Sequence, residues 1–140
     1  LTPAELAAPA DFARNLHINL TARAWLTQAC LPLLRQQGDA AVVFVVDDPA
    51  RVGQAYWGAY GAAQHAQRGL LASLHHETAA GPVRISGLQP GPMRTALRAR
   101  AFTHQEDSEA LDPTRYAAAC VTLLSTAGGA YRGAIWSPSA

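Results

Sequence analysis

The side chains that could take part in chemistry lie in three short stretches of the chain. They are Asp47, Asp48, Tyr60, Gln64 and Thr95. Tyr60 and Gln64 stand one helical turn apart, so a helix would place the phenol and the amide on the same face. The two aspartates follow an apolar run, and they could supply a catalytic carboxylate or form only a turn after a strand. Thr95 comes shortly after Pro90-Gly91-Pro92, which breaks the chain.

Residues that the sequence lacks argue against lysine chemistry, a metal site and a dinucleotide site. All eleven basic residues are arginine, so no lysine can act. His75 and His76 are adjacent and would point to different sides of a helix, with no cysteine or carboxylate to complete a set, so we expect no metal site. Arg94, Arg98 and Arg100 could meet a phosphate or form a solvated face. Because no glycine-rich turn joins a strand to a helix, we expect that this chain alone cannot hold the pyrophosphate of a dinucleotide.

Helices and buried strands must position these side chains. The expected order is a helix over about 11–37, a strand over 40–46, a helix over about 57–79, a strand over 83–88, a flap over 93–111, a helix from Asp112-Pro113 to Gly128-Gly129, and a strand over 131–136. The first helix is expected to bend near Pro32. This order predicts an α/β fold, a partial doubly wound (Rossmann-like) parallel sheet of about three strands with flanking helices, in a single domain over 1–140. In such sheets ligands bind at the carboxyl ends of the strands, which is where Asp47-Asp48 and 90–95 fall.

Composition narrows the class of partner. Of 140 residues, 49% are hydrophobic and 15% are charged, which suits one globular domain. A net charge of +1 argues against nucleic acid and against a polybasic membrane surface as partners. No apolar run is long enough to span a bilayer, and the first residues do not resemble a signal peptide. Cys30 and Cys120 lie in apolar helical patterns, so we expect free thiols in a reducing compartment, the cytoplasm.

The predicted sheet would be incomplete by itself. Three parallel strands would leave the 40–46 strand as an open edge, and the helices would have apolar faces with nothing to cover them. Since the chain starts at Leu1 and not at Met, we expect a fragment that lacks an N-terminal half, or a second chain that supplies the cover. The expected partner is another copy, bound through the helices over about 11–37 and 57–79.

Several motifs follow one another in a specific order. Asn19 follows an apolar residue in the long helix, Tyr60 lies on the helix after a Val-rich strand, and Pro90-Gly91 ends the next strand, shortly before Thr95. Over almost the whole chain, this order resembles the carboxyl-terminal, substrate-side half of the short-chain dehydrogenase/reductase family. The resemblance implies hydride transfer between NAD or NADP and a small-molecule alcohol or carbonyl. It implies that Tyr60 gives or takes a proton, that Asn19 organises a relay water, and that Pro90, Gly91 and Thr95 contact the nicotinamide.

Two positions depart from the family pattern. Asp47 stands where the family has a serine that binds the substrate carbonyl, and Gln64 stands where it has a lysine. An added carboxylate and a lost ammonium both disfavour a tyrosinate, so we expect Tyr60 to be a poor general base.

These departures keep several interpretations open. The chain could be a divergent or truncated oxidoreductase, weakly active or inactive alone, or a non-catalytic oligomerisation module derived from that fold. Tyr60 could also be a packing aromatic, and Asn19 could be a polar residue of the helix interior that bonds to the backbone.

Overall fold

Three parallel strands form the centre of the fold in a computed structural model that describes residues 1–102 and 108–138. β1 (Ala40–Val45) pairs with β2 (Val83–Leu88), and the register runs from Ala40 opposite Val83 to Val45 opposite Leu88. β2 also pairs with the short β3 (Ile135–Trp136). The strand order β1-β2-β3 leaves β1 at an edge of the described sheet, and it confirms the predicted α/β class with its parallel sheet.

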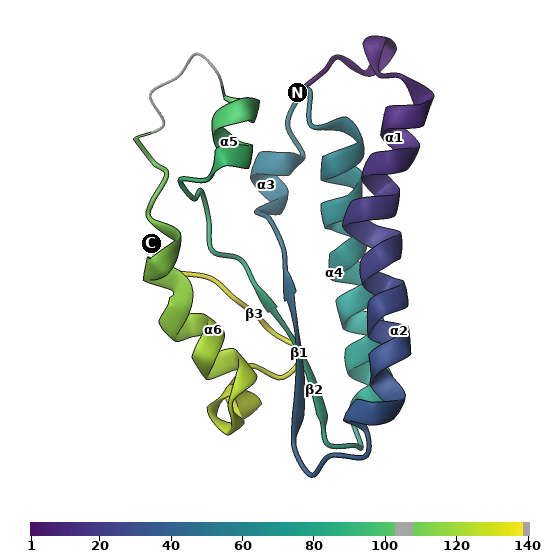
Figure 1. The fold of residues 1–140 in the computed structure, drawn as a ribbon, viewed down its shortest axis with the longest axis vertical. Coiled ribbons are helices and arrows are strands. Elements are labelled where there is room, and N and C mark those ends of the chain that lie inside the picture. Colours follow the sequence, from purple (N-terminus) through teal and green to yellow (C-terminus); the bar gives the residue numbers. More distant parts are fainter. Residues whose placement is uncertain (103–107, 139–140) are drawn as a thin grey trace.

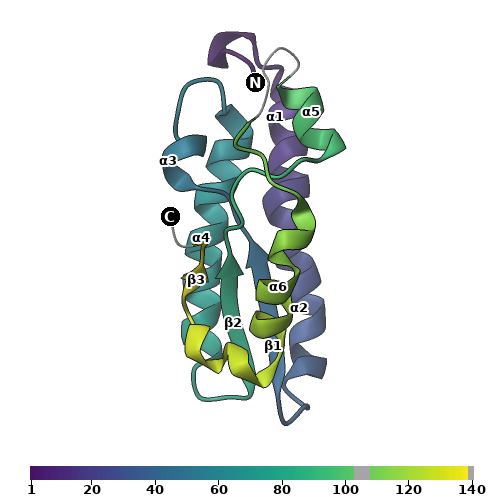
Figure 2. The same ribbon diagram turned by 90° about the vertical axis from the view of Figure 1, so that its left-hand side faces the viewer.

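Helices lie on both faces of this sheet (Figures 1 and 2). On one face, α1 (Pro9–Leu16) and α2 (Ala22–Leu34) run in line and lie beside α4 (Gly58–Thr78). α6 (Ala117–Leu124) covers the other face. The short helices α3 (Pro49–Val52) and α5 (Ala96–Ala101) lie at the end of the molecule to which β1 and β2 point.

The apolar core lies between the sheet and α4. Its fully or almost fully buried members are Ala40, Phe44, Val46, Leu71, Leu74, Val83 and Ile85. Every residue of β2 is buried, because this strand has a neighbour on both sides and helices on both faces. The sheet fixes the points at which β1 and β2 end. Asp47 and Pro90 follow shortly after these two ends.

The amino-terminal half matches the sequence prediction closely, with two differences. The long helix begins at Pro9, and its irregularity lies at His17–Thr21, where the backbone widens into a π-helical turn; Pro32 lies inside α2 near its end. The segment after β1 contains more than a turn, because Asp48 accepts a hydrogen bond from the Ala50 amide (3.0 Å) and caps α3.

The carboxyl-terminal quarter differs more. As expected, a helical segment begins after Asp112, whose side chain caps it by accepting from the Thr114 amide. However, α6 ends at Leu124, and Thr126–Tyr131 forms a 3-10 helix where the sequence predicts first helix and then strand. The third strand is confined to Ile135–Trp136, because Gly133 has φ +76 and turns the chain just before it. In the expected flap, α5 is one of the short helices, while 103–107 lie outside the described residues.

Candidate active site

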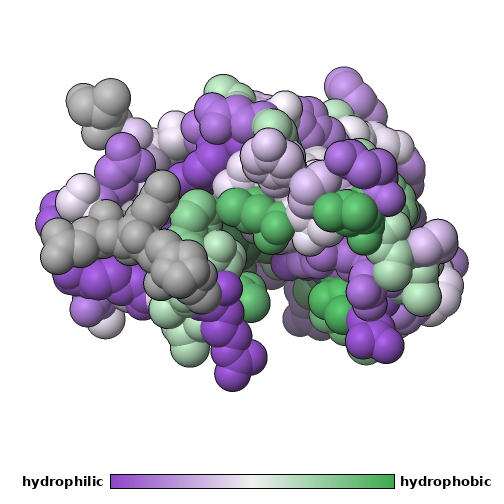
Figure 3. Space-filling model, turned by 90° about the horizontal axis from the view of Figure 1, so that it is seen from above, coloured by the Kyte–Doolittle hydropathy of each residue, from purple (hydrophilic) through white to green (hydrophobic). Residues whose placement is uncertain are grey.

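A pocket of about 610 Å³ opens at the carboxyl ends of β1 and β2. Seen from that end, apolar side chains flank a hollow (Figure 3). The apolar side chains that line it include Leu6, Phe12, Trp57, Met93, Leu97 and Phe102. The polar ones include Asn15, Asp47, Arg51, Tyr60, Thr95 and Arg98. Four segments of the chain therefore meet here: the amino-terminal segment that runs into α1, the segment after β1, the start of α4 with the residues just before it, and the segment after β2.

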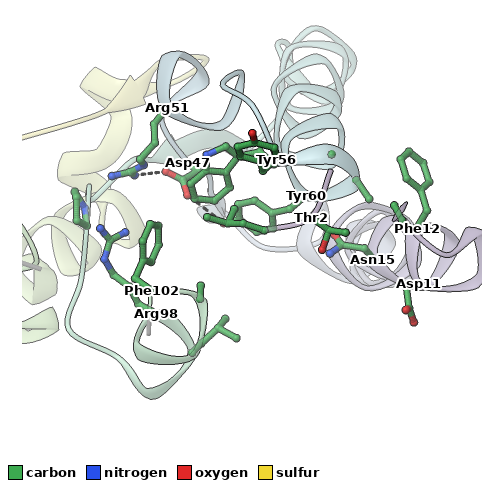
Figure 4. Close-up of a pocket in the computed structure, with 18 of the residues that line it drawn as sticks. Thr2, Asp11, Phe12, Asn15, Asp47, Arg51, Tyr56, Tyr60, Arg98 and Phe102 are labelled. Atoms are coloured by element: carbon green, nitrogen blue, oxygen red, sulfur yellow. Dashed lines mark hydrogen bonds and ion pairs between the residues drawn. The ribbon is translucent and has the colours of Figure 1, made fainter. Parts of the chain in front are cut away.

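The centre of the pocket is a contact between Tyr60 and Asp47. Tyr60 lies in the first turn of α4, and its hydroxyl donates to Oδ2 of Asp47 over 3.2 Å (Figure 4). α4 can approach the loop after β1 because it has glycine at position 61, where a Cβ atom would collide with the Val52 carbonyl. The spacing of Tyr60 and Asp47 in the sequence thus becomes a direct hydrogen bond.

Asp47 is held in place by its own neighbours. Its Oδ1 forms an ion pair with Arg51 of α3 and accepts from the Asp48 amide over 2.7 Å. Its backbone is fixed from α4, because its amide donates to Oε1 of Gln64 (3.0 Å) and its carbonyl accepts from Arg68 (3.0 Å). Only Oδ2 is left to meet Tyr60 and the pocket.

This environment raises the pKa of Tyr60 to about 12, from an ordinary value of 10.0. Burial of the hydroxyl is the largest cause, and the negative charge of Asp47 and its hydrogen bond add to it, while Arg23 and Arg51 act in the opposite direction. The direction is the one that the sequence predicts. The sequence argument named the charges alone, and burial is the cause that it missed.

Gln64 does not face the pocket. It is 3% exposed and does not line the cavity, and its side-chain oxygen serves the Asp47 amide. Gln64, at the lysine position of the family pattern, therefore holds the backbone of Asp47 and carries no charge.

Asn19 is also not among the residues that line the pocket. It stands in the π-helical turn, where its amide donates to the Asn15 carbonyl (3.1 Å) and to Asn15 Oδ1 (2.9 Å). This is the backbone-bonded arrangement that the sequence left open as an alternative. Asn15 itself lines the pocket, so Asn19 is linked to the pocket through its hydrogen bonds to Asn15.

The segment after β2 brings two of its three candidate residues to the pocket. Gly91 and Thr95 line the pocket, whereas Pro90 is buried and does not line it. Thr95 also caps α5, because its hydroxyl accepts from the Arg98 amide over 3.2 Å. Tyr60, Asp47, Gly91 and Thr95 are therefore the sequence candidates that the structure brings together.

Sequence reasoning missed the aromatic wall and the cation beside Asp47. The Trp57 ring lies 5.7 Å from the Tyr60 ring and 6.1 Å from the Phe102 ring, measured between centroids. The Arg98 guanidinium lies over Phe102, 4.5 Å from its centre. A helical spacing links Asp47 with Arg51, and this could have indicated the ion pair. Nothing in the sequence indicated that Phe102 reaches Trp57.

Two negative findings apply to residues 1–102 and 108–138. No helix in this part of the chain is long and apolar enough to cross a membrane. Histidine, cysteine and acidic side chains do not gather there in any group of three that could hold a metal ion. Cys30 and Cys120 are free thiols and half-buried.

Comparisons with known proteins agree with one another. The family described as short chain dehydrogenase matches residues 1–106. Uncharacterized oxidoreductase YciK of Escherichia coli is 36% identical over 98 residues, which are 70% of this chain and 38% of that protein.

Solved structures extend the match to nearly the whole chain. A short chain dehydrogenase from Salmonella enterica serovar Typhi aligns with a TM-score of 0.90 and 27% identity, over 98% of this chain and 56% of that one. A short chain dehydrogenase from Escherichia coli, solved in complex with NADPH, aligns with a TM-score of 0.88 and 29% identity, over 96% of this chain and 56% of that one. The chain thus spans 38% of the curated relative named above and a little over half of these solved chains.

Proposed function

Because this chain belongs to the short-chain dehydrogenase family, we propose that it forms the substrate-side half of an oxidoreductase that acts on an alcohol or carbonyl with NAD or NADP. One observation carries the proposal. Tyr60 from α4 and Gly91 and Thr95 from the segment after β2 line one pocket, at the carboxyl ends of two parallel strands. Ligands of open parallel sheets bind at this place.

Tyr60 is the proposed proton donor. A bound nicotinamide would supply a hydride to the carbonyl carbon of the substrate. Tyr60 lines the pocket, and its hydroxyl stays protonated at neutral pH because its pKa is about 12. It can therefore donate a hydrogen bond, and then a proton, to the carbonyl oxygen. Oxidation of an alcohol would start from a tyrosinate, and burial and Asp47 keep the population of that form low at neutral pH.

Some of the residues at this site suit the nicotinamide end of the cofactor, and one does not. Gly91 and Thr95 border the pocket beside Tyr60 and would contact the nicotinamide, with Pro90 supporting their turn from inside. Gln64 fits poorly, because its side-chain oxygen is already bonded to the Asp47 amide and it carries no charge. We therefore propose weak or no activity for this chain alone.

A chimera tests this function. The amino-terminal half of YciK would be joined to this chain, and NADPH oxidation would be followed with a set of ketones and aldehydes. We expect slow reduction that Tyr60→Phe abolishes and that Tyr56→Phe, a matched change at a second tyrosine of the pocket, leaves in place. Gln64→Lys with Asp47→Ser should raise the rate by about 100-fold, because it restores a low tyrosine pKa and a carbonyl donor. A folded chimera that binds NADPH but reduces nothing, even with both changes, would exclude the proposed function.

Self-association is the second part of the proposal. Trp25, Leu26 and Leu33 of α2 are 59%, 67% and 65% exposed, which is unusual for large apolar side chains on one helix. We propose that a second copy covers α2 and α4, and this surface would also serve the alternative function of a non-catalytic interaction module.

Free thiols and the absence of a spanning helix in the described residues support a cytoplasmic location.

A further inference from the structure

The pocket combines a carboxylate and a protonated phenol, which is an unusual pair for hydride chemistry. Asp47 keeps Oδ1 on Arg51 and on the Asp48 amide, and its Oδ2 meets the Tyr60 hydroxyl at 3.2 Å. Both groups line the same cavity (Figure 4). Because the carboxylate and the phenol are adjacent, one substrate molecule can contact both of them through two nearby atoms.

We propose that Asp47 and Tyr60 catalyse proton exchange at the carbon next to a carbonyl group, without a cofactor. Oδ2 of Asp47 takes the proton as the C–H bond breaks. The electron pair of that bond forms the carbon–carbon double bond of an enolate, and the carbonyl π pair moves to oxygen, where the Tyr60 hydroxyl donates a hydrogen bond. Asp47 exchanges the proton it has taken with solvent through the open pocket and returns a solvent proton, or a deuteron in deuterated buffer, to the carbon, so nothing is oxidised or reduced.

The physical requirements of such a reaction are met here. A general base needs a fixed carboxylate oxygen, and Asp47 is held by its ion pair with Arg51, by the bond from its amide to Gln64 and by the bond from Arg68 to its carbonyl. The developing negative oxygen needs a donor that keeps its proton, and a pKa of about 12 keeps Tyr60 in that state. An aspartate base with a tyrosine donor in an apolar cavity is a known arrangement for enolisation in an unrelated isomerase.

The lining of the pocket identifies the class of substrate. Trp57, Phe102, Leu97 and Met93 provide an apolar and partly aromatic wall, while Asp47 and Tyr60 provide hydrogen-bonding atoms. A volume of about 610 Å³ suits a small organic molecule. The fitting substrate is an apolar, ring-bearing ketone with an acidic C–H bond next to its carbonyl. The inference needs no nicotinamide, so its failure would not affect the proposed oxidoreductase function.

Hydrogen–deuterium exchange tests the inference directly. The 140-residue chain would be incubated with phenylacetone in deuterated buffer, and the loss of the benzylic proton signal would be followed by NMR. We expect exchange about 100-fold faster than in buffer alone. Asp47→Asn should remove this acceleration, and Asp112→Asn, which changes an exposed carboxylate and keeps its capping role, should retain it. Tyr60→Phe should lower the rate while Asp47 still acts as base.

A measurement on the unaltered chain guards against variants that misfold. 2-Naphthol is a planar aromatic analogue of an enolate, and it should inhibit the exchange by occupying the pocket. The proposal is overturned if exchange in the wild type is no faster than in buffer. It is also overturned if Asp47→Asn, shown by circular dichroism to be folded, exchanges as fast as the wild type, or if saturating 2-naphthol leaves the rate unchanged.

Discussion

The Tyr60 hydroxyl donates to Oδ2 of Asp47 over 3.2 Å, and this contact ties the first turn of α4 to the segment after β1. A short hydroxyl side chain at position 47 would add no charge beside the phenol. The carboxylate instead favours the protonated phenol, and Arg51 and Gln64 hold it where it can do so. Tyr60 therefore behaves as a proton donor that does not readily become a base.

Removing the Tyr60 hydroxyl should cost little stability. Tyr60→Phe deletes the bond to Asp47, but the pocket is open, so water can take the place of the lost donor. We expect the free energy of unfolding to fall by less than about 1 kcal/mol. Denaturant unfolding of both proteins at an unchanged slope measures the difference. A loss above about 2 kcal/mol would instead indicate a hydroxyl that is essential to the core.

Stability should fall in alkaline solution because of Tyr60. Its pKa is about 12 in the folded chain and 10.0 ordinarily, so the unfolded chain loses this proton first. Between these pH values the unfolded state binds fewer protons, and the free energy of unfolding falls as pH rises. Thermal unfolding of the wild type and of Tyr60→Phe over this window shows the effect. The variant should lose less stability, and parallel curves would mean that Tyr60 titrates alike in both states.

The chain alone should bind NAD(H) and NADP(H) weakly. Gly91 and Thr95, which border the pocket beside Tyr60, would offer a nicotinamide few contacts, and the sequence shows no glycine-rich turn between a strand and a helix to hold the pyrophosphate. We expect dissociation constants of about 1 mM or weaker, which would leave titration calorimetry at micromolar protein without a resolvable signal. Micromolar binding would show that other residues hold the dinucleotide.

Association should depend on the outer surface of α2. Leu26→Ser with Leu33→Ser should shift the chain from a dimer or larger species toward a monomer, because both side chains are exposed. Val121→Ser on α6 is the matched control, since Val121 is 68% exposed on the opposite face of the sheet. Light scattering at micromolar concentration measures the mass. A wild type that is already a well-behaved monomer would contradict the proposed association.

The sequence predicted the sheet well and its surroundings less well. Runs such as Val42–Val46 are rich in β-branched residues and unbroken, so their place in a parallel sheet follows from local pattern. Their burial was overestimated, because β1 is an edge strand of the described sheet and Val45 is 48% exposed. Tyr60 and Asp47 could be expected near one another, because both lie close to the carboxyl end of β1. The loop from Thr126 to Ala134 could not be predicted in this way, since its course depends on the positive φ of Gly133.

Side-chain partners were harder to predict than elements. The partner of the Asn19 side chain was not predicted: it is Asn15, because the π-helical turn brings the two amides together, while the relay role of Asn19 stays a prediction. Gln64 points at the Asp47 amide and away from the pocket, which depends on how closely α4 packs on the sheet. Tertiary packing decides which partner each of these side chains bonds to. Residue spacing along one helix contains little information about those partners.

The most direct test of the account is the titration of Tyr60 itself. Ultraviolet absorbance of tyrosinate would be followed against pH in the wild type, in Tyr60→Phe to identify its contribution, and in Asp47→Asn. We predict a pKa of about 12 for Tyr60 in the wild type, and a lower value that stays above 10.0 in Asp47→Asn, because burial remains when the charge is removed. A wild-type Tyr60 that titrates near 10.0 would contradict the claim that burial and Asp47 together raise its pKa, and an unchanged pKa in Asp47→Asn would contradict the part that Asp47 plays.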